Sequence, residues 1–492
     1  MLKFFTANIL PGTVLTIAVF FCYTSGTGLE RIELKYNDAI SRAAFSGGRN
    51  DDVAILKDGS GSGCAVYREN LTKVMNLLSS SGSVPVSVAV LYRGCESKKK
   101  ADEELIADIA EEYERYKKED IIKETEENGK PHFLEAISGI NPDAISENRL
   151  YAAMKRLPGT IIPFSFTTGR ALARPEEMPA EIKKSSALPY GRYKKSSLYY
   201  NEGIAFSAPA AELTGSATWA GFDNIIPDGD GKTRFLYPFI IYNGRIYPSV
   251  PLLMAAAHMK AALNDILYLP GQELKIKDMS ARLNGFSALK LSYPPDAASE
   301  YTFTQLFSGK IPPGTFKNKM LILSGGNSPA LDTVYGKMTE AEYIASAAAS
   351  VLRKEKIHRP ENISEKETAV ILAAGLLLVL LFPHLNFKAA FAAAAVTVAA
   401  LLGAEIYAFI KYSVWIKMTY PAVLVSAGFI LISAQNFFNK YEKRKSSKVK
   451  KTDIRDIKQD PAAGKDALSK DGKFSIIIQT NSCLNNDTEK KS

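Results

Sequence analysis

The stretch that decides the fold runs from "DVAILKDG" (residues 52–59) through "YRENLTKVMNLLSSSG" (67–82) to "VPVSVAVLY" (84–92). The first and third segments are short apolar runs bounded by turn residues, which predicts strands. In the second, the apolar residues from Leu71 to Leu78 recur on one face at helical spacing. Strand, helix, strand is the βαβ unit of a parallel sheet. We therefore predict an α/β domain with a mixed, partly parallel sheet and flanking helices.

The net charge of +9 is concentrated in one segment of the 492-residue chain. Residues 439–492 hold 14 Lys+Arg and 8 Asp+Glu, a net charge of +6, so the rest of the chain carries only +3. The long polar middle therefore lacks the basic surplus that is typical of nucleic-acid-binding domains. We expect no nucleic-acid partner.

Four apolar runs, one near the start and three near the end, predict four transmembrane helices. They lie within residues 4–23, 368–385, 389–410 and 418–438. Each approaches or reaches the length of about 20 residues that a helix needs to cross the hydrocarbon core. A cleaved signal peptide is the alternative for the first run. Glu405 is costly inside a membrane, and we expect it at the interface because it lies near one end of its run.

Basic residues after the last run set the predicted orientation. Against one acid, Glu442, the chain places there Lys440, Lys443, Arg444, Lys445, Lys448, Lys450 and Lys451. This end should stay in the cytoplasm, and four spans then place the N-terminus there as well. We predict a multi-pass protein of the cell inner (plasma) membrane with four parts: an anchor (1–28), an extracytoplasmic domain (29–364), three transmembrane helices (365–438) and a basic, mostly disordered cytoplasmic tail (439–492).

Two of the four cysteines are candidates for a disulfide. Cys64 and Cys95 each follow one of the two predicted strands of the βαβ unit. If these strands are neighbours, about 4.8 Å apart, the two residues come within reach of each other, and an oxidising compartment would permit the bond. Two unpaired thiols are the alternative. No spacing of cysteine and histidine predicts a metal site.

The segment "IPDGDGKTRF" (226–235) lies between two further predicted strands, in "ATWAGFDNI" (217–225) and "RFLYPFIIYNG" (234–244). A calcium loop starting at Asp228 would need a bidentate Glu at its twelfth position, where Phe239 stands. Phosphate-loop and hydrolase motifs are missing from the sequence. We interpret the segment as a turn, and we predict no metal, no cofactor and no catalytic residue.

The same segment resembles the signature of the CHASE domain, type two. The matching residues are Asn224, Asp228, Asp230, Gly231, Arg234, Pro248 and Ser249. Residues 301–326 and 342–360 resemble the later blocks of that family, and residues 29–42 resemble its opening. The resemblance covers about residues 29–436. It implies a bacterial extracellular sensor domain that lies between one transmembrane helix and three.

The resemblance implies a membrane-bound sensory receptor rather than an enzyme. Its domain would detect an unknown extracytoplasmic ligand and signal through the transmembrane helices to a cytoplasmic protein. Membrane lipid and a second copy of the chain are further expected partners. The alternative is a truncated or degenerate signalling enzyme, of the adenylate cyclase or histidine kinase type, without its output domain. In an α/β sheet the ligand is expected beyond the carboxyl ends of the strands, here at residues 57–62, 93–96 and 324–328.

Overall fold

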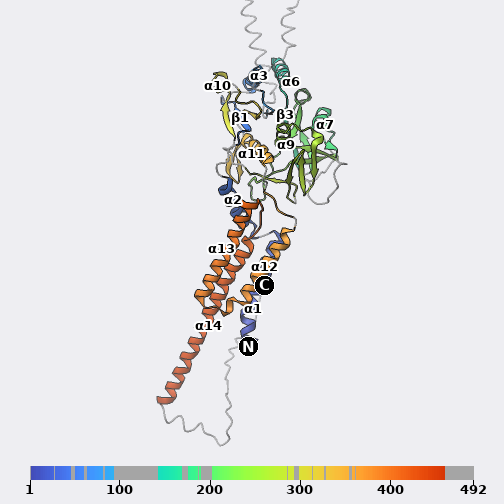
Figure 1. Ribbon diagram of the computed structural model, residues 1–492. Helices are drawn as coiled ribbons and strands as arrows, with labels where there is room; N and C mark the ends of the chain where they lie inside the picture. Colours follow the sequence, from blue (N-terminus) through green and yellow to red (C-terminus); the bar gives the residue numbers. More distant parts are fainter. Residues whose placement is uncertain are drawn as a thin grey trace, which may run out of the picture.

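The computed structural model contains an α/β domain and a bundle of long helices that projects from it (Figure 1). It describes residues 2–26, 28–45, 50–59, 64–80, 84–92, 142–168, 176–186, 188–189, 202–284, 286–292, 298–312, 314–325, 329–353, 357–360 and 362–459. The charge-rich segment 98–130 lies outside these residues.

A seven-stranded sheet forms the centre of the α/β domain. Its order is β14-β1-β15-β2-β3-β5, and β6 pairs with β3. All neighbours are parallel except β3 and β5, which confirms the predicted mixed, partly parallel sheet. The strands are β1 (Val53–Lys57), β2 (Ser87–Leu91), β3 (Thr160–Thr168), β5 (Gly203–Ser207), β6 (Trp219–Phe222), β14 (Ser299–Thr302) and β15 (Met320–Ser324).

Helices cover both faces of this sheet because successive residues of a buried strand point to opposite sides. In β1, Val53 and Ile55 belong to one core cluster, and Ala54 and Leu56 belong to the other. The first cluster is shared with α9 (Val250–His258) and α11 (Glu340–Leu352), and the second with α3 (Cys64–Ser80) and α6 (Pro142–Arg156).

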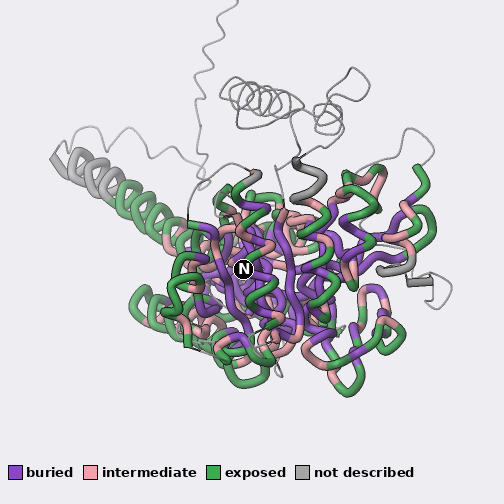
Figure 2. Tube along the Cα trace, turned by 90° about the horizontal axis from the view of Figure 1, so that it is seen from above, coloured by how far each residue is buried: buried purple, intermediate pink, exposed green. Residues whose placement is uncertain are grey.

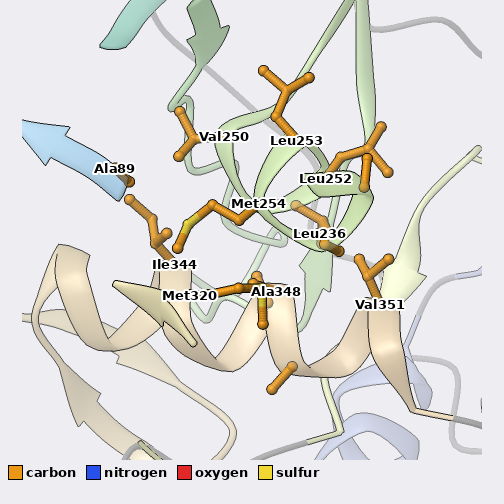
Figure 3. Packing of buried hydrophobic residues seen from close by; sticks show 14 of the residues in the cluster. Ala89, Leu236, Val250, Leu252, Leu253, Met254, Met320, Ile344, Ala348 and Val351 are labelled. Atoms are coloured by element: carbon orange, nitrogen blue, oxygen red, sulfur yellow. The ribbon is translucent and has the colours of Figure 1, made fainter. Parts of the chain in front are cut away.

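The layer under α9 and α11 is the larger of the two clusters in the described residues. Figure 3 shows Ala89 and Met320 of the sheet facing Met254 of α9 and Ile344 and Ala348 of α11. Seen from above, the buried residues gather in the middle of the domain, and the exposed residues lie around them (Figure 2). Each fully buried large aliphatic side chain contributes about 1.5–3 kcal/mol, so this layer is a main source of stability.

The two strands of the predicted βαβ unit form, but they are not neighbours. β15 lies between them: its residue Ile322 pairs with Ile55 on one side and with Ala89 on the other. β1 and β2 are therefore about 9.6 Å apart, two strand spacings, and the condition for our disulfide argument is not met. Cys64 is nevertheless disulfide-bonded. Cys95 lies outside the described residues, so their pairing stays a prediction.

Smaller sheets and short helices complete the domain. The strands are β4 (Leu188–Pro189), β8 (Phe239–Tyr242) and β9 (Arg245–Pro248) in one sheet, β7 (Phe235–Leu236) and β13 (Leu289–Lys290) in a second, β10 (Ile266–Leu269), β11 (Glu273–Ile276) and β12 (Met279–Arg282) in a third, and β16 (Leu331–Thr333) and β17 (Gly336–Met338) in a fourth. The helices are α2 (Glu30–Phe45), α7 (Ala180–Ser186), α8 (Ala211–Ser216) and α10 (Phe303–Phe307). Two 3-10 turns lie at Leu263–Asp265 and Phe382–His384.

The helix bundle consists of α1 (Leu2–Ser25), α12 (Ile363–Leu380), α13 (Phe387–Tyr412) and α14 (Thr419–Gln459). Its three C-terminal members are long and apolar enough to cross a membrane, as predicted. A fourth candidate exists only if α1 and α2, which are bent by 68° relative to each other, count as one broken span. The predicted anchor at residues 4–23 therefore stays a prediction.

Small residues let the bundle helices approach closely. A Cβ atom on Gly375 of α12 would collide with Thr16 of α1, and one on Gly428 of α14 would collide with Leu378 of α12. Such contacts are typical of helices that pack within a membrane, where lipid removes the hydrophobic drive for association. α14 does not end with the apolar run. It continues as one helix to Gln459, into the segment that we expected to be mostly disordered. Residues 460–492 lie outside the described part of the chain.

Candidate functional site

The segment 226–235 forms a tight turn between β6 and β7, as predicted. The backbone N–H of Asp228 donates to the carbonyl of Lys232 (2.9 Å), and that of Gly231 donates to the carbonyl of Asp228 (2.8 Å). Gly231 has φ +82°, a left-handed conformation that glycine adopts without steric cost. The Asp230 side chain accepts the N–H of Lys232, as turn aspartates commonly do.

The turn does more than reverse the chain, because it surrounds Arg234 with carboxylates. The Nη1 atom of Arg234 donates to Asp228 (2.8 Å) and Asp230 (2.7 Å), and its Nη2 atom donates to Asp230 (2.7 Å) and Asp38 (2.9 Å). Its Nε atom donates to Asp38 (2.8 Å). All five donors of the guanidinium are therefore used, and the side chain is 2% exposed. Lys232 adds a longer ion pair to Asp38 (3.3 Å).

Charge pairing dominates the electrostatics of this cluster. Hydrogen bonds from Arg234 hold the pKa of Asp230 at about 2, well below its ordinary value of 3.8. Burial raises the pKa of Asp228, although the same guanidinium opposes the shift. Three carboxylates thus face a fixed internal cation. Among the described residues, no group of three or more His, Cys, Asp or Glu side chains is arranged to hold a metal ion.

Asp38 belongs to α2, so the cluster ties the turn to the helix that follows α1. A second tie lies on β13, whose Lys290 pairs in register with Phe235 directly after Arg234. The ammonium of Lys290 donates to the side-chain oxygen of Asn37, also on α2. Adjacent residues of α2 are therefore held by Lys290 of β13 and by Arg234, which directly precedes the paired strand β7.

Lys290 also contacts the membrane bundle. Its Nζ atom stands 5.1 Å from the ring centroid of Phe409 on α13 and 4.8 Å from that of Trp415 in the α13–α14 loop. The residue is 4% exposed. Burial lowers the pKa of its amine to about 7, against the opposing effect of Asp38. The protonated amine is attracted electrostatically to the faces of the two aromatic rings, which offsets part of the cost of burying its charge.

α2 reaches the bundle through two further hydrogen bonds. The indole N–H of Trp415 donates to the buried carboxylate of Glu33 (3.0 Å), and the hydroxyl of Tyr36 donates to the carbonyl of Leu402 on α13 (3.2 Å). Burial raises the pKa of Glu33. α2 therefore contacts the bundle at positions 33 and 36, and the α/β domain at positions 37 and 38.

A buried carboxylate joins the remaining helices. Glu367, in the first turns of α12, accepts from the hydroxyl of Tyr23 on α1 (2.5 Å), the guanidinium of Arg359 (2.5 Å) and the backbone N–H of Lys417 before α14 (2.7 Å). Glu405 of α13 accepts the backbone N–H of Met418 (3.2 Å). It lies near the domain-side end of its helix, as expected, but it is buried by protein rather than placed at the membrane interface.

These contacts form one layer between the two parts of the molecule, which we call the junction. It comprises the 226–235 turn, β13 and α2 on the domain side, and residues 357–360, 362–367 and 402–418 on the bundle side. Backbone hydrogen bonds complete it, because His358 donates to the carbonyl of Ser413 (2.9 Å) and Trp415 donates to the carbonyl of His358 (3.0 Å).

The seven residues of the family signature separate into two groups. Asp228, Asp230, Gly231 and Arg234 meet at the junction. The other three lie elsewhere. The Asn224 side chain bonds both the N–H (2.7 Å) and the carbonyl of Phe166 on β3 (2.5 Å), and therefore extends the sheet.

Pro248 and Ser249 have a structural position as well. Pro248 ends β9, where it pairs with Phe239, and Ser249 precedes the first turn of α9. Ser249 also forms a bridge with Phe222 at the end of β6. The two residues therefore direct α9 onto the central sheet and lie apart from the Arg234 cluster.

Our sequence reasoning missed most of the junction. The residues that it did not single out are Glu33, Asn37, Asp38, Lys290, Glu367 and Trp415. One signal was available, since the polar residues of α2 recur at helical spacing beside a membrane segment. The positions that contact them, however, follow hundreds of residues later.

The predicted ligand edge is described only in part. The carboxyl ends of β1 and β15 lie side by side, with Lys57 paired to Ser324 and the N–H of Asp58 donating to the carbonyl of Ser324 (2.8 Å). Residues 60–62, 93–96 and 326–328 lie outside the described residues. A ligand pocket at this edge stays a prediction.

Comparison with known families agrees with the resemblance of the signature. The model of the CHASE2 domain matches residues 14–382, which is 369 of the 492 residues. A search of curated proteins and a search of solved structures found no match. CHASE2 is a family of extracellular sensor domains, in keeping with an α/β domain joined to candidate membrane helices. The chain belongs to the CHASE2 domain family.

Proposed function

We propose that this chain is a membrane-bound sensory receptor whose extracytoplasmic domain detects a signal and transmits it through the transmembrane helices to a cytoplasmic partner. The observation that carries the proposal is the junction, where buried charged side chains join the domain to the ends of the helices. Separating the members of a buried ion pair costs about 3–5 kcal/mol. A change in the domain that moves α2 is therefore expected to move the helices with it.

The contacts supply a continuous route for such a change. Arg234 holds α2 through Asp38, and α2 holds the bundle through Glu33 and Trp415. Trp415 lies four residues before α14, the helix that runs to the far end of the bundle. Energetic coupling between distant sites travels through contiguous networks of this kind, provided that they have two arrangements.

The proposal can be tested without knowledge of the ligand. The full chain, with Cys22→Ser, Cys483→Ser and Lys440→Cys, is spin-labelled at position 440 on exposed α14 and placed in phosphatidylcholine nanodiscs. Asp38→Asn perturbs the domain side of the junction. We expect it to change the mobility of the label, which electron paramagnetic resonance measures.

Asp278→Asn is the matched control, because Asp278 is exposed on the turn between β11 and β12 and is not one of the residues of the junction. Trp415→Phe, which removes only the indole donor to Glu33, serves as a milder second perturbation. Unchanged spectra for both junction variants, in protein that remains folded by circular dichroism, would contradict transmission through this layer.

A further inference from the structure

A polar cavity of about 750 Å³ lies where the α/β domain meets the start of α12. Its volume is within the range of small-molecule sites, about 300–1,000 Å³. Two segments far apart in the sequence form its walls. They are residues 271–273 and 282–283 at the β11–β12 hairpin, and residues 359, 360, 362, 364 and 366 at the entry to α12.

The lining is cationic. Its described lining residues include Arg282, Arg359 and Lys366 and one acid, Glu273. Because Arg359 is ion-paired with Glu367 behind the lining, a net charge of +1 remains on the described walls. Arg282 and Lys366 are exposed and come from opposite walls. The Nη2 atom of Arg359 is bound to Glu367, whereas its Nη1 atom is buried and has no hydrogen-bond partner in the described part of the chain. The carboxylate of Glu273 accepts the hydroxyl of Ser280.

The position of the cavity indicates the class of ligand that it binds. Lys366 lies in the first turn of α12, and only the buried Glu367 separates it from the uncharged run that begins at Thr368. If α12 spans the membrane as we propose, this end of the helix lies at the level of the lipid headgroups. α12 starts without a side-chain cap from Asn362. The N–H of Ile363 donates to the carbonyl of Pro360 (3.2 Å), and the dipole of this 18-residue helix favours an anion at its start.

We infer that this cavity binds the phosphate of an anionic phospholipid in the leaflet next to the α/β domain. Arg282 and Lys366 contact the phosphate from its two sides. The neutral donors Gln272, Asn362 and Ser364 suit a hydroxyl-bearing headgroup such as glycerol. A lipid rather than free phosphate is the source, because the acyl chains of a bilayer present headgroup phosphates at this depth. The bound lipid thus bridges the domain and α12.

The test uses the full chain in a non-ionic detergent, titrated with short-chain phosphatidylglycerol and followed by native mass spectrometry. Arg282→Gln and Lys366→Gln should each weaken binding about tenfold, the usual effect of losing one charge-assisted hydrogen bond. Two matched controls should bind within about twofold of the wild type. Lys275→Gln is exposed on β11 outside the cavity, and Lys411→Gln is exposed at the domain-side end of α13.

Equal losses in the cavity variants and the controls would overturn the inference, because they would indicate general attraction to a basic surface. Binding of phosphatidylcholine as tightly as phosphatidylglycerol would also overturn it. Inorganic phosphate is the third arm. If it displaces the lipid at equal concentration, the site takes free phosphate and the lipid assignment is wrong. None of these readouts depends on signalling, so a failure here is distinct from a failure of the proposed receptor function.

Discussion

At Arg234, one guanidinium binds three carboxylates, one of which lies 196 residues away in the sequence. A planar donor with five N–H groups can satisfy bidentate contacts to Asp38 and Asp230 together, which the ammonium of a lysine cannot. This geometry explains why the turn carries two aspartates. Local hydrogen bonds account for the shape of the turn, and the ion pairs account for its chemistry.

Asp38→Asn should destabilise the protein more than any exposed substitution. It leaves two donors of the buried Arg234 without a charged partner, and breaking a buried ion pair costs about 3–5 kcal/mol. We expect a lower apparent Tm for the full chain in detergent. Asp278→Asn provides the control and should change the Tm little. Equal Tm values for the two variants would show that the pairing to α2 contributes nothing to stability.

The lowered pKa of Lys290 predicts that the stability of the protein rises with pH. Its amine has a pKa of about 7 in the folded state and an ordinary value of 10.5 when unfolded. Between these values the unfolded state binds more protons, so the free energy of unfolding increases as the pH rises from 7 to 10.5.

The variant Lys290→Met removes this group, and the slope of apparent Tm against pH should become flatter in the same window. Lys275→Met, at an exposed lysine on β11, should keep the slope of the wild type. If Lys290→Met keeps it as well, the amine does not titrate differently in the two states.

At the scale of elements, α2 connects the two parts of the molecule. Its 16 residues carry polar side chains that are buried on both sides, towards the 226–235 turn and towards α13. A surface helix normally buries an apolar stripe and leaves its polar residues in water. The polar residues of α2 are instead used for specific contacts, which hold the helix in one register against the bundle.

A double-mutant cycle tests the link between α2 and the α13–α14 loop. Glu33→Gln and Trp415→Phe remove the two partners of one buried hydrogen bond, so their effects on unfolding free energy should be non-additive by about 0.5–3 kcal/mol. The other tryptophan of the chain gives a matched control, because Trp219 lies in β6. Glu33→Gln with Trp219→Phe should be additive. Additivity in both cycles would contradict the contact.

At the scale of the whole molecule, the α/β domain stands at one end of the bundle and the basic extension of α14 at the other (Figure 1). The bundle has three helices that qualify as membrane spans, and α1 lies against them. Lysines and arginines stay on the cytoplasmic side of a membrane. The architecture therefore supports the proposed orientation, with the domain outside.

Labelling in intact cells tests that orientation. In a background with Cys22→Ser and Cys483→Ser, Lys275→Cys places a thiol on the exposed face of β11, and Lys443→Cys places one on the α14 extension. A membrane-impermeant maleimide should label position 275 at once and position 443 only after permeabilisation. The reverse result would place the domain in the cytoplasm and overturn the receptor proposal.

Features with a local cause were predictable from the sequence. The periods of 2 and 3.6 identified β1, α3 and β2, and Asp-Gly pairs identified the 226–235 turn. Long apolar runs identified the three C-terminal membrane helices. The exact end of α14 was not predictable in the same way, because a charged segment that continues a helix has the same composition as one that does not.

What the sequence by itself determined was which segments become strands, helices, turns and membrane spans, because each depends on neighbours a few residues away. Only the tertiary structure decided that β15 enters between β1 and β2, and that Asp38, Lys290 and Trp415 meet at the junction. These contacts join residues hundreds of positions apart, and their energies depend on burial, which no local pattern records. The identity of a charged residue in the sequence does not indicate whether water or another buried charge surrounds it.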